Sequence, residues 1–404
     1  MNFETFNLHP SIMAGVHALG YTVPTPIQLQ AIPPIMQGHD IIGLAQTGTG
    51  KTAAFVLPIL QHLRQNPRGC IRALIISPTR ELAEQTCEVI SKLGSKTNLQ
   101  SIAIYGGVSM EQQKRGLRNG AEIVVACPGR LLDHLWNGTI SLSELEILVI
   151  DEADRMFDMG FLPDIHNILR CILHKHQTLL FSATMPADIR RLVRQTLHNP
   201  VNIQIDRRLP AKTVSHFLYP VQQHLKTTLL KEILNKTETD SVLVFTRTKH
   251  RAERVAQQLV SSGYRVTSLQ GNLSQNQRQA ALTSFRNGKV KIMVATDIAA
   301  RGIDVLSISH VINYDMPEST DDYIHRIGRT GRVDKSGDAL TFVTSADADK
   351  ILALEQILNA PLQRLRLKGF DYDKPAPNKE LRLSQKPRQR VIQRQEFGRQ
   401  TAMK

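Results

Sequence analysis

The sequence predicts an α/β protein with two tandem domains, each a mostly parallel sheet flanked by helices, followed by a basic, flexible C-terminal tail. The 404 residues exceed the usual size of a single core. Apolar strand-like runs alternate with amphipathic segments in two blocks, and a polar, proline-broken stretch separates the blocks. We expect domains over residues 1–205 and 214–360, a linker over 206–213, and a largely disordered tail over 361–404.

The first domain begins with a helical pattern from Pro10 to Leu19 and a second short helix from Ile27. Two prolines, Pro24 and Pro26, disfavour one continuous helix there. Apolar runs predict strands at Ile41–Ala45, Ala73–Ser77, Ser101–Tyr105, Ile123–Ala126, Ile147–Ile150 and Thr178–Ser182. Amphipathic segments lie between most of them, which indicates right-handed β-α-β units and a parallel sheet.

The same alternation restarts after the linker. Apolar runs predict strands at Val242–Phe245, Arg265–Leu269, Lys291–Ala295, His310–Tyr314 and Ala339–Val343. Helical segments such as His250–Ser261 and Gln275–Phe285 separate them. A second α/β domain therefore follows the first.

The composition, 41% hydrophobic and 21% charged residues, is that of an ordinary globular protein. We see neither a signal-peptide pattern nor an apolar run of membrane-spanning length. We therefore expect a cytoplasmic protein without membrane contact. The four cysteines form no C-x-x-C pair, which favours free thiols over a disulfide framework or a zinc site.

The net charge of +14 suggests a polyanionic partner, although a basic surface can also simply aid solubility. Residues 361–404 contain 12 lysines and arginines against 4 acidic residues, so this short segment holds +8 of the total. We expect it to add salt-sensitive affinity for such a polyanion.

A glycine-rich loop follows the first predicted strand and precedes a helix. It reads Ala45-Gln46-Thr47-Gly48-Thr49-Gly50-Lys51-Thr52, and this setting is what a phosphate-binding P-loop requires. Glycines let backbone N–H groups turn toward phosphate, and the helix presents its positive N-terminal end. We expect Lys51 to reach the β- and γ-phosphates and the Thr52 hydroxyl to bind Mg²⁺. Ala45 replaces the first glycine of the general pattern, and a coincidental match is the alternative.

Two adjacent carboxylates follow the buried run Ile147–Ile150. Asp151 and Glu152 should emerge at the carboxyl end of a strand, where open parallel sheets bind ligands. With a P-loop in the same domain, Asp151 is the expected metal ligand and Glu152 the expected general base for the attacking water. The alternative is an ordinary solvated strand end, with Asp154 only tying neighbouring loops together.

The tetrapeptide Asp151-Glu152-Ala153-Asp154, the loop at residues 45–52 and several further blocks resemble the DEAD-box family of ATP-dependent RNA helicases. The resemblance covers about residues 4–345, and the blocks occur in the family's order. It implies two RecA-like domains that close on ATP and single-stranded RNA together.

Gly20-Tyr21 followed by Pro24-Thr25-Pro26-Ile27-Gln28 resembles the family's Q motif, within about residues 4–32. An amide can pair with both the donor and the acceptor on the edge of adenine, so Gln28 would select ATP over GTP. The resemblance implies that Tyr21 stacks on the base and that Phe6 supports the segment.

Further blocks of the first domain match the family's RNA-contacting segments. A helix N-terminus and the hydroxyl of its first residue can hold an RNA phosphate, although a tight turn is the alternative for the glycine pairs. The expected RNA contacts here are Thr79, Arg80, Gly107, Gly129 and Arg130. Cys127 stands where the family usually has threonine, so one hydroxyl contact to RNA is missing from the pattern.

Ser182-Ala183-Thr184 follows the last predicted strand of the first domain and matches the family's coupling motif. Its hydroxyls could hydrogen-bond the carboxylates of residues 151–154 and relay the nucleotide state to the RNA side. The resemblance implies coupling roles for Asp154, Ser182, Thr184 and His325.

The second domain supplies the remaining blocks, at residues 244–248, 270–278 and 296–304. The resemblance implies RNA-backbone contacts from Thr246, Arg247, Gly271, Arg278 and Thr296. It implies ATP-ribose contacts from Gly302 and Asp304.

The block His325-Arg326-Ile327-Gly328-Arg329-Thr330-Gly331-Arg332 is rich in arginine. Arg329 and Arg332 are three apart, which on one helical face would let both guanidiniums enter one cleft as arginine fingers. An ordinary basic surface is the alternative. If these fingers come from the second domain and the P-loop from the first, hydrolysis requires closure.

These resemblances imply an RNA-stimulated ATPase that destabilises short RNA duplexes by gripping one strand through its backbone. The block at residues 155–161 and the short basic tail look most like the bacterial RhlE-type branch, whose members are linked to ribosome assembly and RNA turnover. Possible partners are ribosomal or RNA-decay proteins, and we expect a monomer that is open or variable without ligand. The alternatives are an ATP-gated RNA clamp with little turnover and a DNA helicase or translocase.

Overall fold

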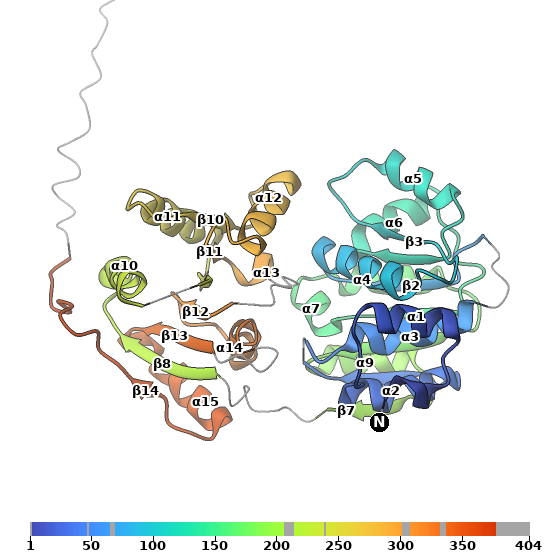
Figure 1. Ribbon diagram of the computed structural model, residues 1–404, viewed down its shortest axis with the longest axis horizontal. Helices are drawn as coiled ribbons and strands as arrows, with labels where there is room; N and C mark the ends of the chain where they lie inside the picture. The colour runs from blue at the N-terminus through green and yellow to red at the C-terminus, as the bar shows by residue number, and fades with distance from the viewer. Residues whose placement is uncertain are drawn as a thin grey trace, which may run out of the picture.

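The computed structural model describes residues 2–46, 48–64, 69–205, 214–237, 240–300, 308–331 and 337–376. These residues form two seven-stranded sheets in which each strand runs parallel to its neighbours. Helices cover both sheets, and the two domains face each other side by side (Figure 1). The predicted linker at 206–213 and the tail beyond residue 376 lie outside the described residues.

The first sheet has the strand order β3-β4-β2-β5-β6-β1-β7. Its strands are β1 (Ile41–Leu44), β2 (Ala73–Ile76), β3 (Ser101–Ile104), β4 (Ile123–Ala126), β5 (Ile147–Ile150), β6 (Gln177–Ser182) and β7 (Val201–Gln204). The helices are η1 (Phe3–Phe6), α1 (Pro10–Ala18), α2 (Pro26–Met36), α3 (Lys51–Leu63), α4 (Arg80–Leu93), α5 (Met110–Arg118), α6 (Pro128–Trp136), α7 (Ala153–Asp158), α8 (Leu162–Arg170) and α9 (Ala187–Thr196).

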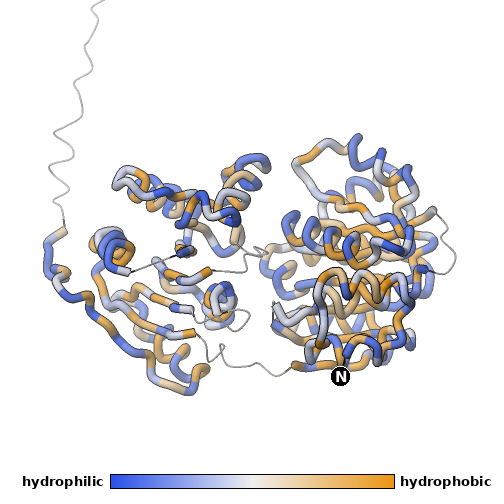
Figure 2. Tube along the Cα trace, viewed as in Figure 1, coloured by the Kyte–Doolittle hydropathy of each residue, from blue (hydrophilic) through white to orange (hydrophobic). Residues whose placement is uncertain are grey.

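Successive residues of the central strands enter two different hydrophobic cores. Ile75 packs with α1 to α4 on one face of the sheet, and Ile76 packs with α6 to α9 on the other. Because both faces are covered, these strands are apolar throughout. Figure 2 shows this concentration of hydrophobic residues inside the first domain. This double burial explains why the predicted strand runs match the observed ones to within one residue.

The second sheet has the order β10-β11-β9-β12-β13-β8-β14. Its strands are β8 (Val214–Pro220), β9 (Val242–Phe245), β10 (Val266–Leu269), β11 (Ile292–Ala295), β12 (His310–Asn313), β13 (Gly337–Val343) and β14 (Gln363–Arg364). The helices are η2 (Gln223–Leu225), α10 (Lys226–Lys236), α11 (Lys249–Val260), α12 (Gln275–Arg286), α13 (Asp297–Ala300), α14 (Thr320–Ile327), η3 (Ser345–Asp347) and α15 (Ala348–Leu358).

Three strands, β7, β8 and β14, were not predicted. β7 is an edge strand with one buried residue, Ile203, so it lacks the apolar run that marks the central strands. β14 pairs with β8 at the other sheet's edge. Its segment belongs to the expected tail, yet Leu362, Phe370 and Tyr372 pack against the cores of the second domain. The described start of the tail is therefore a packed strap and not a disordered segment.

Parallel pairing places the carboxyl ends of all strands in a domain at one edge of its sheet. The P-loop, Asp151, Thr246 and Thr296 follow strands at these edges, and Ser182 is the last residue of β6. Within the described residues, no helix is both long and apolar enough to cross a membrane. All four cysteines are free thiols.

Candidate functional site

The loop between β1 and α3 has the backbone of a phosphate cradle. Gly48 and Gly50 take φ values of +85° and +91°, which glycine adopts without strain. Lys51 begins α3, is buried, and its Nζ donates a hydrogen bond to the carbonyl of Ala45 at 2.7 Å. Thr47 lies outside the described residues. The lysine is thus in the loop, but its ammonium is bound to the loop's own backbone.

Gln28 connects the predicted adenine site to this loop. Its Nε2 donates to the carbonyl of Gly50 at 3.1 Å, and its Oε1 accepts from the backbone N–H of Thr25 at 2.9 Å. A Cβ at Gly50 would lie 2.6 Å from Gln28 Nε2, so this approach requires glycine. The ring of Tyr21 stacks on Phe3, with centroids 6.1 Å apart. Phe6 meets the ring of Phe3 edge-on, with ring centroids 5.8 Å apart.

Asp151 and Glu152 are both buried at the end of β5. Glu152 takes a left-handed backbone conformation with φ +52°, which is uncommon for a residue with a side chain. The Glu152 carboxylate forms a buried ion pair with Arg155, one helical turn later. Sequence reasoning assigned no role to Arg155, although the spacing of three residues on a helix is a signal for such a pair.

The two carboxylates differ in ionisation. Burial raises the pKa of Asp151 to about 7, against the opposing charge of Lys51. Burial would also raise the pKa of Glu152, but the charges of Arg155 and Lys51 outweigh it and hold this pKa at about 2. Asp151 is therefore a buried carboxylate short of positive charge, which suits a cation. With the Thr52 hydroxyl it offers oxygen ligands, the type that Mg²⁺ prefers, and Mg²⁺ usually completes its shell with water and phosphate.

Asp154 ties β5 to β6 through the predicted coupling motif. Its Oδ2 accepts hydrogen bonds from the N–H of Ala183 at 3.1 Å and from the N–H and hydroxyl of Thr184 at 2.8 and 3.0 Å. The Ser182 hydroxyl accepts from the N–H of Asp154 at 3.1 Å. A shift of either strand end would therefore move the other.

A small cavity of about 30 Å³ joins the two domains beside these residues. The first domain contributes residues including Lys51, Glu152 and Arg155, and the second contributes His325 and Arg329. Burial raises the pKa of Glu152, Arg155 and Lys51 lower it, and the positive charge of Arg329 adds a smaller lowering. A cavity of this size holds about one water molecule.

The prediction that the two arginine fingers lie on one helical face is wrong. α14 ends at Ile327 with Gly328 as its cap, so Arg329 lies in the following turn. Glycine disfavours the continuation of a helix because ordering its backbone costs more conformational entropy than for other residues. Arg329 nevertheless faces the cavity between the domains. Arg332, Gly302 and Asp304 lie outside the described residues.

A larger groove of about 870 Å³ also spans the two domains. Its lining contains nine of the ten predicted RNA contacts, which come from both sheets. These are Thr79, Arg80, Gly107, Gly129, Arg130, Arg247, Gly271, Arg278 and Thr296. The tenth, Thr246, is fully buried, and its hydroxyl donates to the carbonyl of Thr248 at 3.3 Å. The Thr246 side chain is therefore not exposed to the groove in this conformation, and its contact with RNA stays a prediction.

The arginines of the groove are positioned by residues that the sequence did not single out. The Arg80 guanidinium lies 5.7 Å from the ring centre of Tyr105, and a side chain at Gly107 would collide with it. Arg130 donates to the carbonyl of Val108 and to Oε1 of Gln113, both at 3.1 Å. Gln113 gave no local signal, because its contact depends on the packing of α5 against α6.

One ion pair crosses the groove from domain to domain. Arg278 of α12 donates to Oε1 of Glu81 in α4 from Nε at 3.0 Å and from Nη2 at 2.8 Å. Both side chains are largely buried. This pair joins residues 197 apart in sequence, so spacing could not predict it. The structure thus shows the two domains in contact on the side of the groove as well as at the small cavity.

Cys127 lines the groove at the N-terminal cap of α6, where its side chain makes no capping hydrogen bond. Burial raises the pKa of its thiol to about 12. The thiol therefore stays neutral at physiological pH and presents no negative charge to the groove.

Family models match both domains of the chain. A model described as "DEAD/DEAH box helicase" matches residues 25–192, and one described as "Helicase conserved C-terminal domain" matches residues 225–334.

Individual proteins match over most of the chain. The DEAD-box ATP-dependent RNA helicase RhpA of Helicobacter pylori is 41% identical over 90% of this chain and 73% of its own length. The ATP-dependent rRNA helicase RRP3 of Meyerozyma guilliermondii is 44% identical, over 90% of this chain and 76% of its own length. The structure of Saccharomyces cerevisiae Dbp5 bound to RNA and ADP BeF3 is similar with a TM-score of 0.82 at 30% identity, covering 90% of this chain and 95% of that one.

Proposed function

Because this chain belongs to the DEAD-box family and is an ATP-dependent RNA helicase, we propose that its two domains close on ATP and one RNA strand at the same time. The observation that carries the proposal is the small cavity in which Arg329 of the second domain faces Glu152 and Lys51 of the first. Neither domain alone contains this set of charges. Hydrolysis therefore depends on the contact between domains.

On the nucleotide side, Gln28 would read adenine while Tyr21 stacks on it. The backbone of residues 45–52 would hold the phosphates, and Lys51 would exchange its bond to Ala45 for the β- and γ-phosphates. Gly302 and Asp304 would contact the ribose. Mg²⁺ would be held by Thr52 and Asp151, and when bound it would neutralise charge on the phosphates.

For hydrolysis, Glu152 would accept a proton from the attacking water. The pKa of about 2 makes this carboxylate a weak base while Arg155 is paired with it. Arg155 must therefore release Glu152 in the competent state. Arg329 and Arg332 would stabilise the charge that develops on the transferring phosphoryl group. His325 and the bonds of Asp154 to Ser182 and Thr184 would report this state to the groove.

On the RNA side, the groove presents positive side chains from both domains and few base-reading groups, which suits contacts to phosphate and sugar. Its nine predicted contacts would hold one strand by its backbone. A strand bent to follow both domains cannot stay paired in a regular duplex, so closure would separate short duplexes. Little preference for base sequence follows from this mode of contact.

We also propose a cytoplasmic role in ribosome assembly or RNA turnover, within the RhlE-type branch and as a monomer. The branch proposal rests on residues 155–161 and the short basic tail. The similarity to a protein named as an rRNA helicase supports a ribosomal substrate. Ribosomal or RNA-decay proteins are the corresponding partners.

The test is substitution of the proposed base. Glu152→Gln should bind ATP and RNA with near-normal affinity and lose RNA-stimulated hydrolysis by roughly a hundredfold or more, the usual contribution of a general base. ATPase rates with RNA, binding of a fluorescent ATP analogue and RNA anisotropy would be measured on the same preparations. Glu111→Gln, at an exposed carboxylate of α5, is the matched control.

The rival functions predict different results. Hydrolysis retained in Glu152→Gln would contradict the assigned base. A wild-type chain that binds RNA with ATP but turns over slowly with every RNA would be an ATP-gated clamp. Stimulation by single-stranded DNA equal to that by RNA would favour a DNA helicase or translocase.

A further inference from the structure

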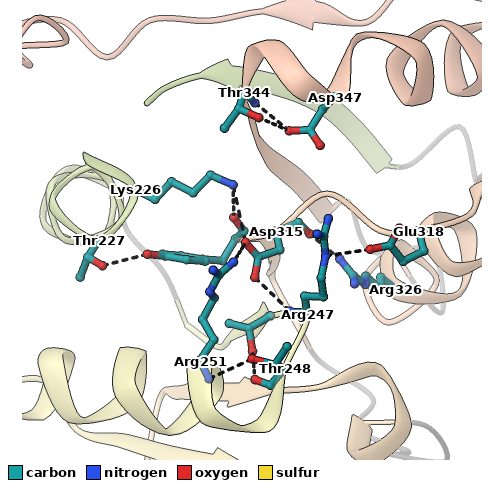
Figure 3. A network of polar contacts seen from close by, with 12 residues as sticks. Lys226, Thr227, Arg247, Thr248, Arg251, Asp315, Glu318, Arg326, Thr344 and Asp347 are labelled. Carbon is teal, nitrogen blue, oxygen red and sulfur yellow. Dashed lines mark hydrogen bonds and ion pairs between the residues drawn. The ribbon is translucent and has the colours of Figure 1, made fainter. Parts of the chain in front are cut away.

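Asp315 follows β12 and lies at the centre of a buried polar network in the second domain (Figure 3). Its side chain is 4% exposed, yet its carboxylate is close to two cations. Oδ1 lies 2.6 Å from Nη1 of Arg251 and 3.7 Å from Nζ of Lys226, and Oδ2 accepts the backbone N–H of Arg247 at 3.0 Å. A buried carboxylate without such partners would be strongly unfavourable.

Lys226 is a buried cation next to the Asp315 carboxylate. Its Nζ is buried and donates to the carbonyl of Tyr314 at 3.0 Å. Burial lowers the pKa of Lys226, and the charge of Asp315 opposes that change. Asp315 therefore supplies the negative charge that keeps two buried or half-buried cations in place.

The bond to Arg247 links this network to the groove. Arg247 lines the groove, and its Nε pairs with Glu318 at 2.8 Å. The segment from Thr246 to Thr248 is fixed at both ends, because Thr246 is buried and the Thr248 hydroxyl caps α11 by accepting from the N–H of Arg251. Asp315 contacts the middle of this segment and also holds the Arg251 side chain.

The main chain of Asp315 reaches the nucleotide side. Its carbonyl accepts from Nη1 of Arg326 at 2.8 Å. Arg326 in turn forms two hydrogen bonds with Asp297, at 2.6 and 2.7 Å. Asp297 follows Thr296 of the groove, and Arg326 precedes Arg329 of the small cavity by three residues.

We propose that Asp315 is a positioning residue for RNA: its carboxylate fixes the Arg247 segment in the groove, while its carbonyl independently supports Arg326 on the nucleotide side. The inference rests on the proposed function of the groove. In this proposal the carboxylate acts on RNA binding and the main-chain carbonyl acts on the nucleotide side. A substitution of the side chain should therefore weaken RNA binding and leave the nucleotide side unchanged.

Asp315→Asn keeps the size of the side chain and the main-chain carbonyl but removes the charge. We expect the RNA concentration for half-maximal ATPase stimulation to rise about tenfold, the order that one charged hydrogen bond contributes. The rate at saturating RNA should change less than twofold, because Arg326 keeps its bond. Arg251→Gln should shift the same RNA concentration in the same direction by a smaller factor, since its side chain is 38% exposed and its loss disturbs folding less.

Asp347→Asn is the matched control. Asp347 is also a buried carboxylate of the second domain, and its charge also acts on Lys226. Within the described residues, however, its hydrogen bonds go to the backbone and hydroxyl of Thr344, at 2.8 and 2.7 Å, and not to the Arg247 segment. It should lower thermal stability without changing the RNA requirement. An equal rise in the RNA requirement for Asp347→Asn would overturn the inference, because the effect would then be general destabilisation.

A second measurement does not depend on RNA. Amide hydrogen exchange at residues 246–248 should be faster in Asp315→Asn than in wild type and in Asp347→Asn, because the neutral amide oxygen of asparagine accepts the Arg247 N–H more weakly than the carboxylate does. Unchanged exchange would overturn the positioning role. If the wild type is not stimulated by RNA, the proposed function fails, while the exchange experiment still decides whether Asp315 holds this segment.

Discussion

Cys127 occupies a position where a hydroxyl could do what a thiol does poorly. It caps α6 without a side-chain hydrogen bond and lines the groove. Thiols are weak donors and acceptors, whereas threonine is a good N-cap and a good phosphate donor.

Replacing Cys127 by Thr should therefore strengthen RNA binding severalfold and stabilise the protein by about 0.5–1 kcal/mol. RNA anisotropy and thermal unfolding would measure the two effects. Cys127→Val, which has the shape of threonine without its hydroxyl, should give neither. Equal RNA affinity for the Thr and Val variants would show that no hydroxyl contact is missing.

Single residues also show where sequence reasoning stopped. The placement of Asp151, Glu152 and Lys51 at the ends of β5 and of the loop after β1 was predictable, because it depends on local order along the chain. The pairing of Glu152 with Arg155 was within reach, since three-residue spacing on a helix brings side chains together. The support of Arg130 by Gln113 was not, because it arises only when α5 and α6 pack.

The ion pair between α4 and α12 is the contact between elements with the clearest consequence. Glu81 and Arg278 meet at 2.8 Å across the domains. Two turns further along α4, the pKa of Glu88 is lowered mainly by its hydrogen bond to Lys92, with a smaller contribution from Arg286 of α12. The two helices therefore carry complementary charge along their facing sides.

Neutralising this pair should open the molecule without ligand. In Glu81→Gln, interdomain fluorescence transfer should fall, and in a double-mutant cycle with Arg278→Gln the coupling energy should be about 1–3 kcal/mol. Glu232→Gln, an exposed carboxylate of α10, is the control. Additive single effects would mean that the pair contributes nothing to closure.

Among the elements, the strands with apolar runs were predictable, including the edge strands β3 and β10, whereas the edge strands β7 and β14 were not. β5 is buried on both faces and reads as a continuous apolar run, whereas β7 has one buried residue and β14 has two residues in all. The strap at residues 361–376 escaped prediction because its few apolar residues are widely spaced among charged ones.

For the whole molecule, the strap changes where the tail should be cut. Leu362, Leu367 and Phe370 pack on the second domain, so removal from residue 365 would expose part of a core. Truncation after Ala376 should leave folding intact, weaken RNA binding and flatten its dependence on salt. RNA affinity measured across a salt series would test this, and an unchanged slope would contradict a role for the tail's charge.

The ion pair between Glu152 and Arg155 has a consequence for the amount of ATP that a cell consumes. A helicase with ATP but without RNA would hydrolyse ATP without unwinding a duplex if its general base were always unpaired. Here the base is neutralised by Arg155, and the phosphate-binding lysine is occupied by Ala45. If Glu152 is the base, we expect these two contacts to limit ATP hydrolysis in the absence of RNA, and RNA binding would have to release them.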